Sequence, residues 1–118
     1  MVVDDSRIMR NIVKRTFEQL KRPVQFLEAA DGKEALHVLI NNPVDLIFLD
    51  WNIPNLSGID FLKKVRSVDK YRNIPIVMVT SESSKLNVVE AIKAGATAYI
   101  TKPFSEKTFF DKVSNIIF

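Results

Sequence analysis

The chain of 118 residues has the length of one domain, and its 47% hydrophobic and 26% charged residues are typical of a soluble globular protein. It has no apolar run long enough for a transmembrane helix, no basic-then-apolar signal peptide at its start, and no cysteine for disulfides or thiolate metal sites. The formal net charge of +3 comes from basic residues scattered among apolar ones, so we expect one cytoplasmic domain, without membrane insertion, that does not bind nucleic acid directly.

Short β-branched runs alternate with amphipathic stretches along the chain. Runs typical of strands occupy residues 2–3, 24–29, 44–49, 76–79 and 98–101, and apolar residues recur at helical spacing in 8–20, 35–40, 59–68, 88–92 and 109–117. Ser6 is placed to cap the first helix, Asp31 and Gly32 are expected to form a turn, and Gly95 suits a left-handed residue after the fourth helix. Five such alternations predict right-handed βαβ units and a parallel sheet with helices on both faces.

Polar side chains follow the carboxyl ends of four of the five predicted strands. They are Asp4 and Asp5, Asp50, Thr80 and Lys102. In open parallel sheets, ligands bind at this edge, at the point where the strand order reverses. The pattern therefore predicts that these residues share one site.

Three carboxylates in one pocket repel one another, and Lys102 alone cannot neutralise them. A hard divalent cation with oxygen ligands, Mg²⁺, is the expected partner because no histidine or cysteine lies nearby in the sequence. Two of the acids can hold the ion while the third attacks phosphorus, which yields an aspartyl phosphate. The cation, Lys102 and a threonine hydroxyl would offset charge on the transferring oxygens.

Five segments resemble the response-regulator receiver domain in order and spacing over nearly the whole chain. They are VVDDS at 2–6, LDWNIP at 49–54, SG at 57–58, VT at 79–80 and TKPF at 101–104. The resemblance implies a flavodoxin-like, doubly wound sheet of five parallel strands in the order 2-1-3-4-5 with five helices, an order already known for chemotaxis receiver domains. It implies that the domain spans 1–118. Only three residues precede the acidic pair, so either strand one is short or the sequence begins inside it.

The resemblance also assigns roles to the matched site residues. Asp50 matches the phosphoacceptor, and Asp4 and Asp5 match the acidic pair that holds Mg²⁺ together with Asp50. The backbone carbonyl of Asn52 matches a further ligand of the ion. Lys102 matches the lysine that contacts the phosphoryl oxygens, and the peptide bond after it is usually cis in the family.

Further roles concern the response to phosphorylation. Thr80 matches the hydroxyl that stabilises the phosphoryl group and moves toward it, and Tyr99 matches the aromatic partner that turns inward as Thr80 shifts. Asn52 and Glu82 match positions that border the hydrolytic water and modulate dephosphorylation. The expected partner face, on the fourth helix, fifth strand and fifth helix, consists of Lys85, Val88, Tyr99, Thr101 and Lys112.

Together these roles imply a phosphorylation-dependent switch of a two-component system. A sensor histidine kinase would donate the phosphoryl group to Asp50, and the altered face would control a downstream partner such as the flagellar motor switch. Residues 50–55 and the pairing of Asn52 with Glu82 resemble the single-domain chemotaxis branch. We expect self-catalysed phosphorylation and dephosphorylation without substrate turnover, in a monomer or weak dimer. Trp51, beside Asp50, is expected to be partly exposed.

Two alternatives remain open at this stage. One is the receiver half of a DNA-binding regulator whose output domain lies beyond Phe118. The other is an Mg²⁺-dependent phosphatase or nucleotide-binding enzyme. Against nucleotide binding, no glycine-rich phosphate loop follows the first strand. Against a phosphatase, the residue two places after Asp50 is Asn52, where a second acid would be expected.

Overall fold

A computed structural model describes residues 1–117, in which five strands alternate with five helices. The strands are β1 (Val2–Val3), β2 (Glu28–Ala29), β3 (Ile47–Leu49), β4 (Ile76–Thr80) and β5 (Ala98–Thr101). The helices are α1 (Arg7–Glu18), α2 (Gly32–Asn41), α3 (Gly58–Arg66), α4 (Lys85–Ala94) and α5 (Glu106–Ile117), with a short 3-10 helix, η1 (Asp69–Tyr71), after α3. Among residues 1–117, no helix has the length and apolar character needed to cross a membrane.

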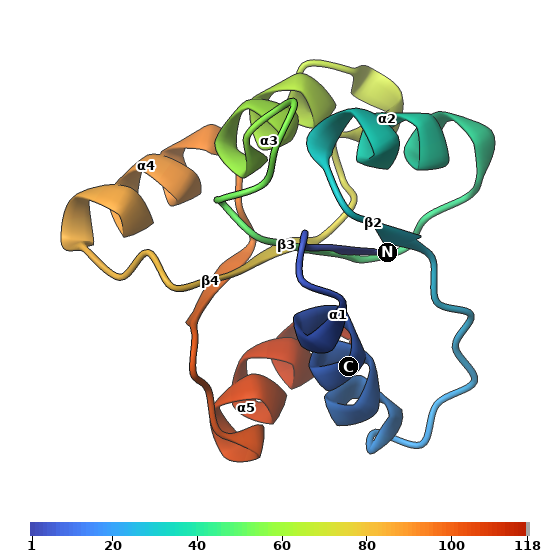
Figure 1. Cartoon of the computed structure of the whole chain (residues 1–118), viewed down its shortest axis with the longest axis vertical. Helices are drawn as coiled ribbons and strands as arrows, with labels where there is room; N and C mark the ends of the chain where they lie inside the picture. Colours follow the sequence, from blue (N-terminus) through green and yellow to red (C-terminus); the bar gives the residue numbers. More distant parts are fainter. Residues whose placement is uncertain (118) are drawn as a thin grey trace.

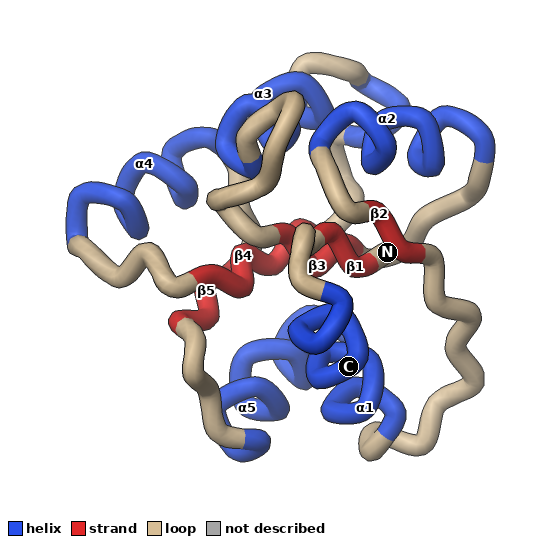
Figure 2. Tube along the Cα trace, in the orientation of Figure 1, coloured by secondary structure: helices blue, strands red, loops and turns tan. Residues whose placement is uncertain are grey.

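The strands form one parallel sheet in the order β2-β1-β3-β4-β5. Helices α2, α3 and α4 cover one face of the sheet, and α1 and α5 cover the other (Figures 1 and 2). This arrangement confirms the predicted doubly wound, flavodoxin-like fold. Because all strands run in the same direction, their carboxyl ends lie at one edge of the sheet.

Two apolar layers hold the helices against the sheet. Successive strand residues point to opposite faces, so Phe48 packs in the layer under α1 and α5 while Leu49 packs under α2, α3 and α4. In the first layer the ring of Phe48 lies 5.8 Å from that of Phe17 and 5.3 Å from that of Phe109. The central strands are buried on both faces, which explains their nearly continuous apolar sequence.

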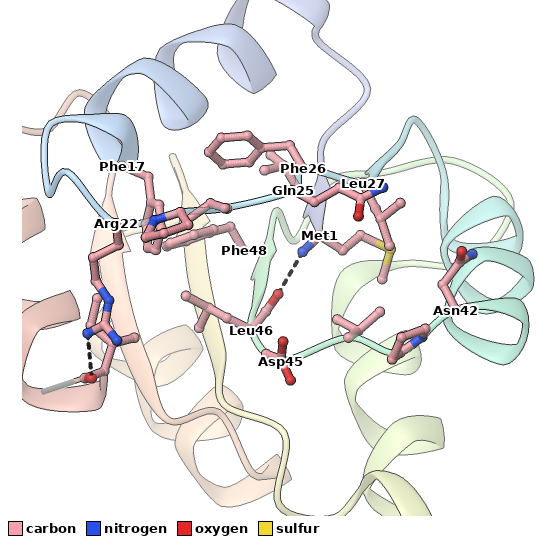
Figure 3. A pocket seen from close by; sticks show the side chains of 16 residues that line it. Met1, Phe17, Arg22, Gln25, Phe26, Leu27, Asn42, Asp45, Leu46 and Phe48 are labelled. Atoms are coloured by element: carbon pink, nitrogen blue, oxygen red, sulfur yellow. Dashed lines mark hydrogen bonds between the residues drawn. The ribbon is translucent and has the colours of Figure 1, made fainter.

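Two strands are shorter than the sequence predicts. The predicted strands 24–29 and 44–49 are reduced to Glu28–Ala29 and Ile47–Leu49. Strand β2 is limited by β1, which pairs with it only through Val2 and Val3, whereas β3 begins at Ile47, the first residue that pairs with β4. The preceding segments instead flank a cavity of about 400 Å³, lined in part by Phe26, Leu27 and Leu46 (Figure 3). This cavity lies at the amino ends of the strands, opposite the edge that carries the predicted site.

Helix ends follow local capping. Ser6 caps α1 as predicted, and Gly95 ends α4 with a φ of 111° in the left-handed region. Asp31 and Gly32 do not form a separate turn: the Asp31 side chain accepts a hydrogen bond from Glu34 N, and Gly32 is the first residue of α2. Ile40, predicted on the apolar face of this helix, is 66% exposed. The predicted third and first helices also end earlier, at Arg66 and Glu18.

Candidate functional site

Three carboxylates meet at the carboxyl edge of the sheet. Val3 at the end of β1 is paired with Leu49 at the end of β3, so the residues that follow them, Asp4 and Asp50, are neighbours. One carboxylate oxygen from each of Asp4, Asp5 and Asp50 lies within 4.8 Å of the others. Asp4 and Asp50 are buried, whereas Asp5 is exposed.

Lys102 joins the two buried acids. Its Nζ donates hydrogen bonds to Asp4 Oδ2 at 2.8 Å and to Asp50 Oδ2 at 3.1 Å. The backbone places it there, since Lys102 N donates to the carbonyl oxygen of Thr80 at 2.8 Å. The Lys102–Pro103 peptide bond is cis. The strand-end residues that the sequence groups into one site are therefore brought together.

Burial and pairing compete in setting the ionisation of these groups. Burial, the largest effect, raises the pKa of Asp4 despite the opposing hydrogen bonds from Lys102 and Ser6 N, and the charge of Asp50 adds to the rise. Burial alone would lower the pKa of Lys102, but the hydrogen bonds and charges of Asp4 and Asp50 outweigh it and raise that pKa. One ammonium thus bonds to two of the three grouped carboxylates.

The donor set fits a hard divalent cation. The grouped ligand atoms are all carboxylate oxygens, the donors that Mg²⁺ prefers, and a cation there would relieve the repulsion that Lys102 leaves. The loop after β3 lies beside the acidic cluster, because Asn52 N donates a hydrogen bond to Asp50 Oδ1 at 3.3 Å.

Thr80 and Tyr99 converge on the backbone of Glu82. Thr80 is fully buried, and its hydroxyl accepts a hydrogen bond from Glu82 N at 3.3 Å. Tyr99 is also buried, and its hydroxyl donates to the carbonyl oxygen of Glu82. Burial raises the pKa of Tyr99, with smaller contributions from the charges of Glu82 and Asp50, so the phenol remains a donor at neutral pH.

The side chain of Glu82 connects two segments. Asn52 Nδ2 donates to Glu82 Oε1 at 2.8 Å, and Asn87 Nδ2 donates to Glu82 Oε2 at 3.2 Å. Asn52 belongs to the loop after β3 and Asn87 to α4, so the carboxylate ties that loop to that helix. The structure thus brings the two predicted dephosphorylation-modulating residues into direct contact.

The predicted partner face surrounds the edge strand β5. Lys85, Thr101 and Lys112 are exposed and Val88 is half-buried, whereas the Tyr99 ring is buried. Lys112 Nζ donates to the backbone carbonyl of Tyr99, which ties α5 to β5. Tyr99 is therefore linked to the rest of this face through its main chain, while its ring is buried.

Two residues that the sequence analysis did not single out also touch the site. Asn87 holds Glu82, and the Arg10 guanidinium donates to the backbone carbonyl of Asp4 at 2.7 Å. Each contact joins a helix to the loop before it. Helical periodicity indicates which residues are apolar and buried, but not which polar side chain turns back toward a loop.

Comparison with known proteins identifies the family. A sequence model of the response regulator receiver domain matches residues 1–114. The chain is 42% identical to a Campylobacter jejuni chemotaxis protein CheY homolog, over 99% of this chain and 90% of that protein, and 41% identical to Helicobacter pylori chemotaxis protein CheY1, over 99% and 94%. Its structure resembles Vibrio cholerae chemotaxis response regulator CheY4, with a TM-score of 0.86 and 34% identity over 98% of this chain and 95% of the other. The chain belongs to the response regulator receiver domain family, and it is similar to the CheY-type chemotaxis proteins of two-component signalling.

Proposed function

We propose that this protein is a phosphorylation-dependent switch of a two-component system and that Asp50 accepts the phosphoryl group. The observation that carries the proposal is the gathering of Asp4, Asp5 and Asp50 within 4.8 Å, together with Lys102 bonded to both buried acids. A structural ion pair would need one carboxylate, whereas phosphoryl transfer uses a nucleophile, a cation site and a positive side chain.

The donor in this proposal is a phosphohistidine of a sensor histidine kinase. An Asp50 carboxylate oxygen attacks phosphorus, a P–O bond forms, and the bond from phosphorus to the imidazole nitrogen breaks, with its electron pair leaving on the imidazole. Asp4, Asp5, Asp50 and the backbone carbonyl of Asn52 would hold Mg²⁺, which when bound offsets negative charge on the transferring oxygens. Lys102 already contacts Asp50 at 3.1 Å and would pair with the same oxygens.

The new charge would act on α4 through Thr80 and Tyr99. Both side chains bind the backbone of Glu82, in the loop before α4, so a Thr80 hydroxyl drawn toward the phosphoryl group would release Glu82 N. That change would alter the face formed by Lys85, Val88, Tyr99, Thr101 and Lys112 and hence the binding of a downstream target.

Asn52 and Glu82 would set the lifetime of the aspartyl phosphate. Asn52 contacts Asp50 through its backbone N and holds Glu82 Oε1 at 2.8 Å, so the pair would be in place to orient a hydrolytic water. In this proposal the domain catalyses its own phosphorylation and dephosphorylation and turns over no separate substrate. It acts in the cytoplasm, as one receiver domain over 1–118 and as a monomer or weak dimer.

The relatives favour a role in chemotaxis rather than a role as the receiver domain of a DNA-binding regulator. Those at 41–42% identity are named chemotaxis proteins. The downstream target would then be a component of the flagellar motor switch, and binding to that component only after phosphorylation would separate the two roles.

Labelling with acetyl phosphate and Mg²⁺ tests the assignment of Asp50. We expect intact-mass analysis to show one added phosphoryl group in the wild type and in Asp60→Asn, whose carboxylate is exposed on α3, but none in Asp50→Asn. Persistent labelling of Asp50→Asn would overturn the proposal. Labelling that does not need Mg²⁺ would overturn its metal component.

A further inference from the structure

Arg10 links the acidic loop to the neighbouring strand. From α1, its Nη1 donates to the backbone carbonyl of Asp4 at 2.7 Å, and its Nε donates to Glu28 Oε1 at 3.0 Å. The Arg10 side chain is only 15% exposed. Glu28 belongs to β2, where it is paired with Val2, so the guanidinium bridges the loop after β1 and an anchored position on the next strand.

The bond to Asp4 has a consequence for Asp5. The carbonyl of Asp4 lies in the planar peptide unit that joins Asp4 to Asp5, so fixing its direction fixes the plane from which Asp5 projects. The other polar atoms of Asp4 are held as well: its N–H by the carbonyl of Ala29, Oδ1 by Ser6 N and Oδ2 by Lys102.

Asp5 itself has no such restraint. Within residues 1–117, no hydrogen bond or ion pair holds its carboxylate, although one of its oxygens lies within 4.8 Å of those of Asp4 and Asp50. The direction of this carboxylate therefore depends on the backbone that carries it. The Arg10 contact restrains that backbone.

Glu28 offsets the positive charge that Arg10 places beside the proposed Mg²⁺ site. An isolated guanidinium next to the acidic cluster would repel a divalent ion. Burial would raise the pKa of Glu28, but its bonds to Lys14 and Arg10 outweigh burial and lower it, so Glu28 is ionised at neutral pH. Its charge offsets that of Arg10 while it anchors the guanidinium.

We propose that Arg10 is a positioning residue of the cation site: it orients the peptide between Asp4 and Asp5 so that Asp5 presents its carboxylate to Mg²⁺, and Glu28 anchors it. This inference rests on the proposed function, because it requires that the acidic cluster bind Mg²⁺. It adds a residue of α1 to the site and assigns it a role through the backbone, since a guanidinium cannot itself be a ligand of a cation.

A pair of matched variants distinguishes an effect of Arg10 on the orientation of Asp5 from an effect of its positive charge. Arg10→Met and Lys14→Met each remove one positive charge from α1 and one partner of Glu28, but only Arg10 contacts Asp4. If charge alone mattered, both variants would bind Mg²⁺ more tightly than the wild type. We expect Arg10→Met to bind about tenfold more weakly than Lys14→Met, as is usual when a residue that orients a metal ligand is lost.

Mg²⁺ affinity is measured by isothermal titration calorimetry, with the fluorescence of Trp51, which follows Asp50, as a second signal. Arg10→Lys covers the possibility that Arg10→Met fails to fold, because it keeps the charge but cannot reproduce the planar fork that reaches both acceptors. Weaker binding by Arg10→Lys than by the wild type supports positioning, and unchanged binding contradicts it.

The outcomes distinguish this inference from the proposed function. Mg²⁺ binding by the wild type, with Arg10→Met binding as tightly as Lys14→Met or more tightly, overturns the role of Arg10 alone. A wild type that binds no Mg²⁺ overturns both the metal component of the proposed function and this inference.

Discussion

Asn52 Nδ2 donates a hydrogen bond of 2.8 Å to Glu82 Oε1, which joins the loop after β3 to the loop after β4. The Glu82 carboxylate also accepts a hydrogen bond from Asn87 on α4, and the Glu82 backbone is hydrogen-bonded to Thr80 and Tyr99. Glu82 is therefore the point at which the loop after β3, the end of the sheet and helix α4 meet. A change at Asp50 has a short physical route to α4 through this residue.

Replacing Glu82 with alanine should slow loss of the phosphoryl group from Asp50. Without its carboxylate, the site loses an acceptor that can orient the attacking water, and Asn52 loses its partner. We expect a roughly tenfold slower rate, equivalent to one hydrogen bond to a charged group. Decay of the phosphorylated form is followed by intact mass. Glu90→Ala, an exposed position on α4, is the control and should keep the wild-type rate; a normal rate in Glu82→Ala would exclude this role.

Replacing Lys102 with methionine should reduce labelling of Asp50 by about 100-fold or more, because the transferring oxygens lose their positive partner. The ammonium lies 3.1 Å from Asp50 and is mostly buried, so water cannot replace it well. Initial rates of labelling with acetyl phosphate give the comparison. Lys107→Met removes an equal charge from an exposed position and should label normally. Similar rates in the two variants would show that only net charge matters.

Ionisation of the buried Asp4 carboxyl group should lower the free energy of unfolding as the pH rises. Its pKa lies above the ordinary value of 3.8, mainly because of burial, so the folded protein binds this proton more tightly than the unfolded chain. The free energy of unfolding must then fall as the pH rises from about 4 through the raised pKa. Asp4→Asn should flatten this dependence in urea unfolding between about pH 4 and pH 7 without Mg²⁺. Asp60→Asn, at an exposed site, should retain the wild-type slope; an unaltered slope in Asp4→Asn would contradict the raised pKa.

Phe109 should contribute more to stability than its neighbour Phe110. Phe109 is fully buried between the rings of Phe48 and Phe104, at 5.3 and 5.4 Å, whereas Phe110 is half-buried. Phe109→Ala should lower the free energy of unfolding by about 3–5 kcal/mol, the usual cost of deleting a core aromatic ring. Phe110→Ala should cost clearly less in the same urea titration. Equal losses would mean that the two rings are equally packed.

The sequence determined which residues share the site. Asp4, Asp50, Thr80 and Lys102 each follow a predicted strand, and parallel strands deliver such residues to one edge whatever the details of packing. Gly95 was also predictable, because a glycine directly after an apolar helical stretch suits the left-handed residue that ends a helix. These features depend on local order along the chain and on the direction of the strands.

Tertiary structure decided the rest. Strand β2 starts only at Glu28 because pairing needs a neighbour, and β1 pairs only through Val2 and Val3. Arg10 reaches Asp4 and Glu28 because α1 packs against this end of the sheet. Sequence periodicity tells which face of a helix is apolar. It does not tell which polar side chain on the opposite face contacts a loop or strand. That contact depends on how two elements from distant parts of the chain are placed in space.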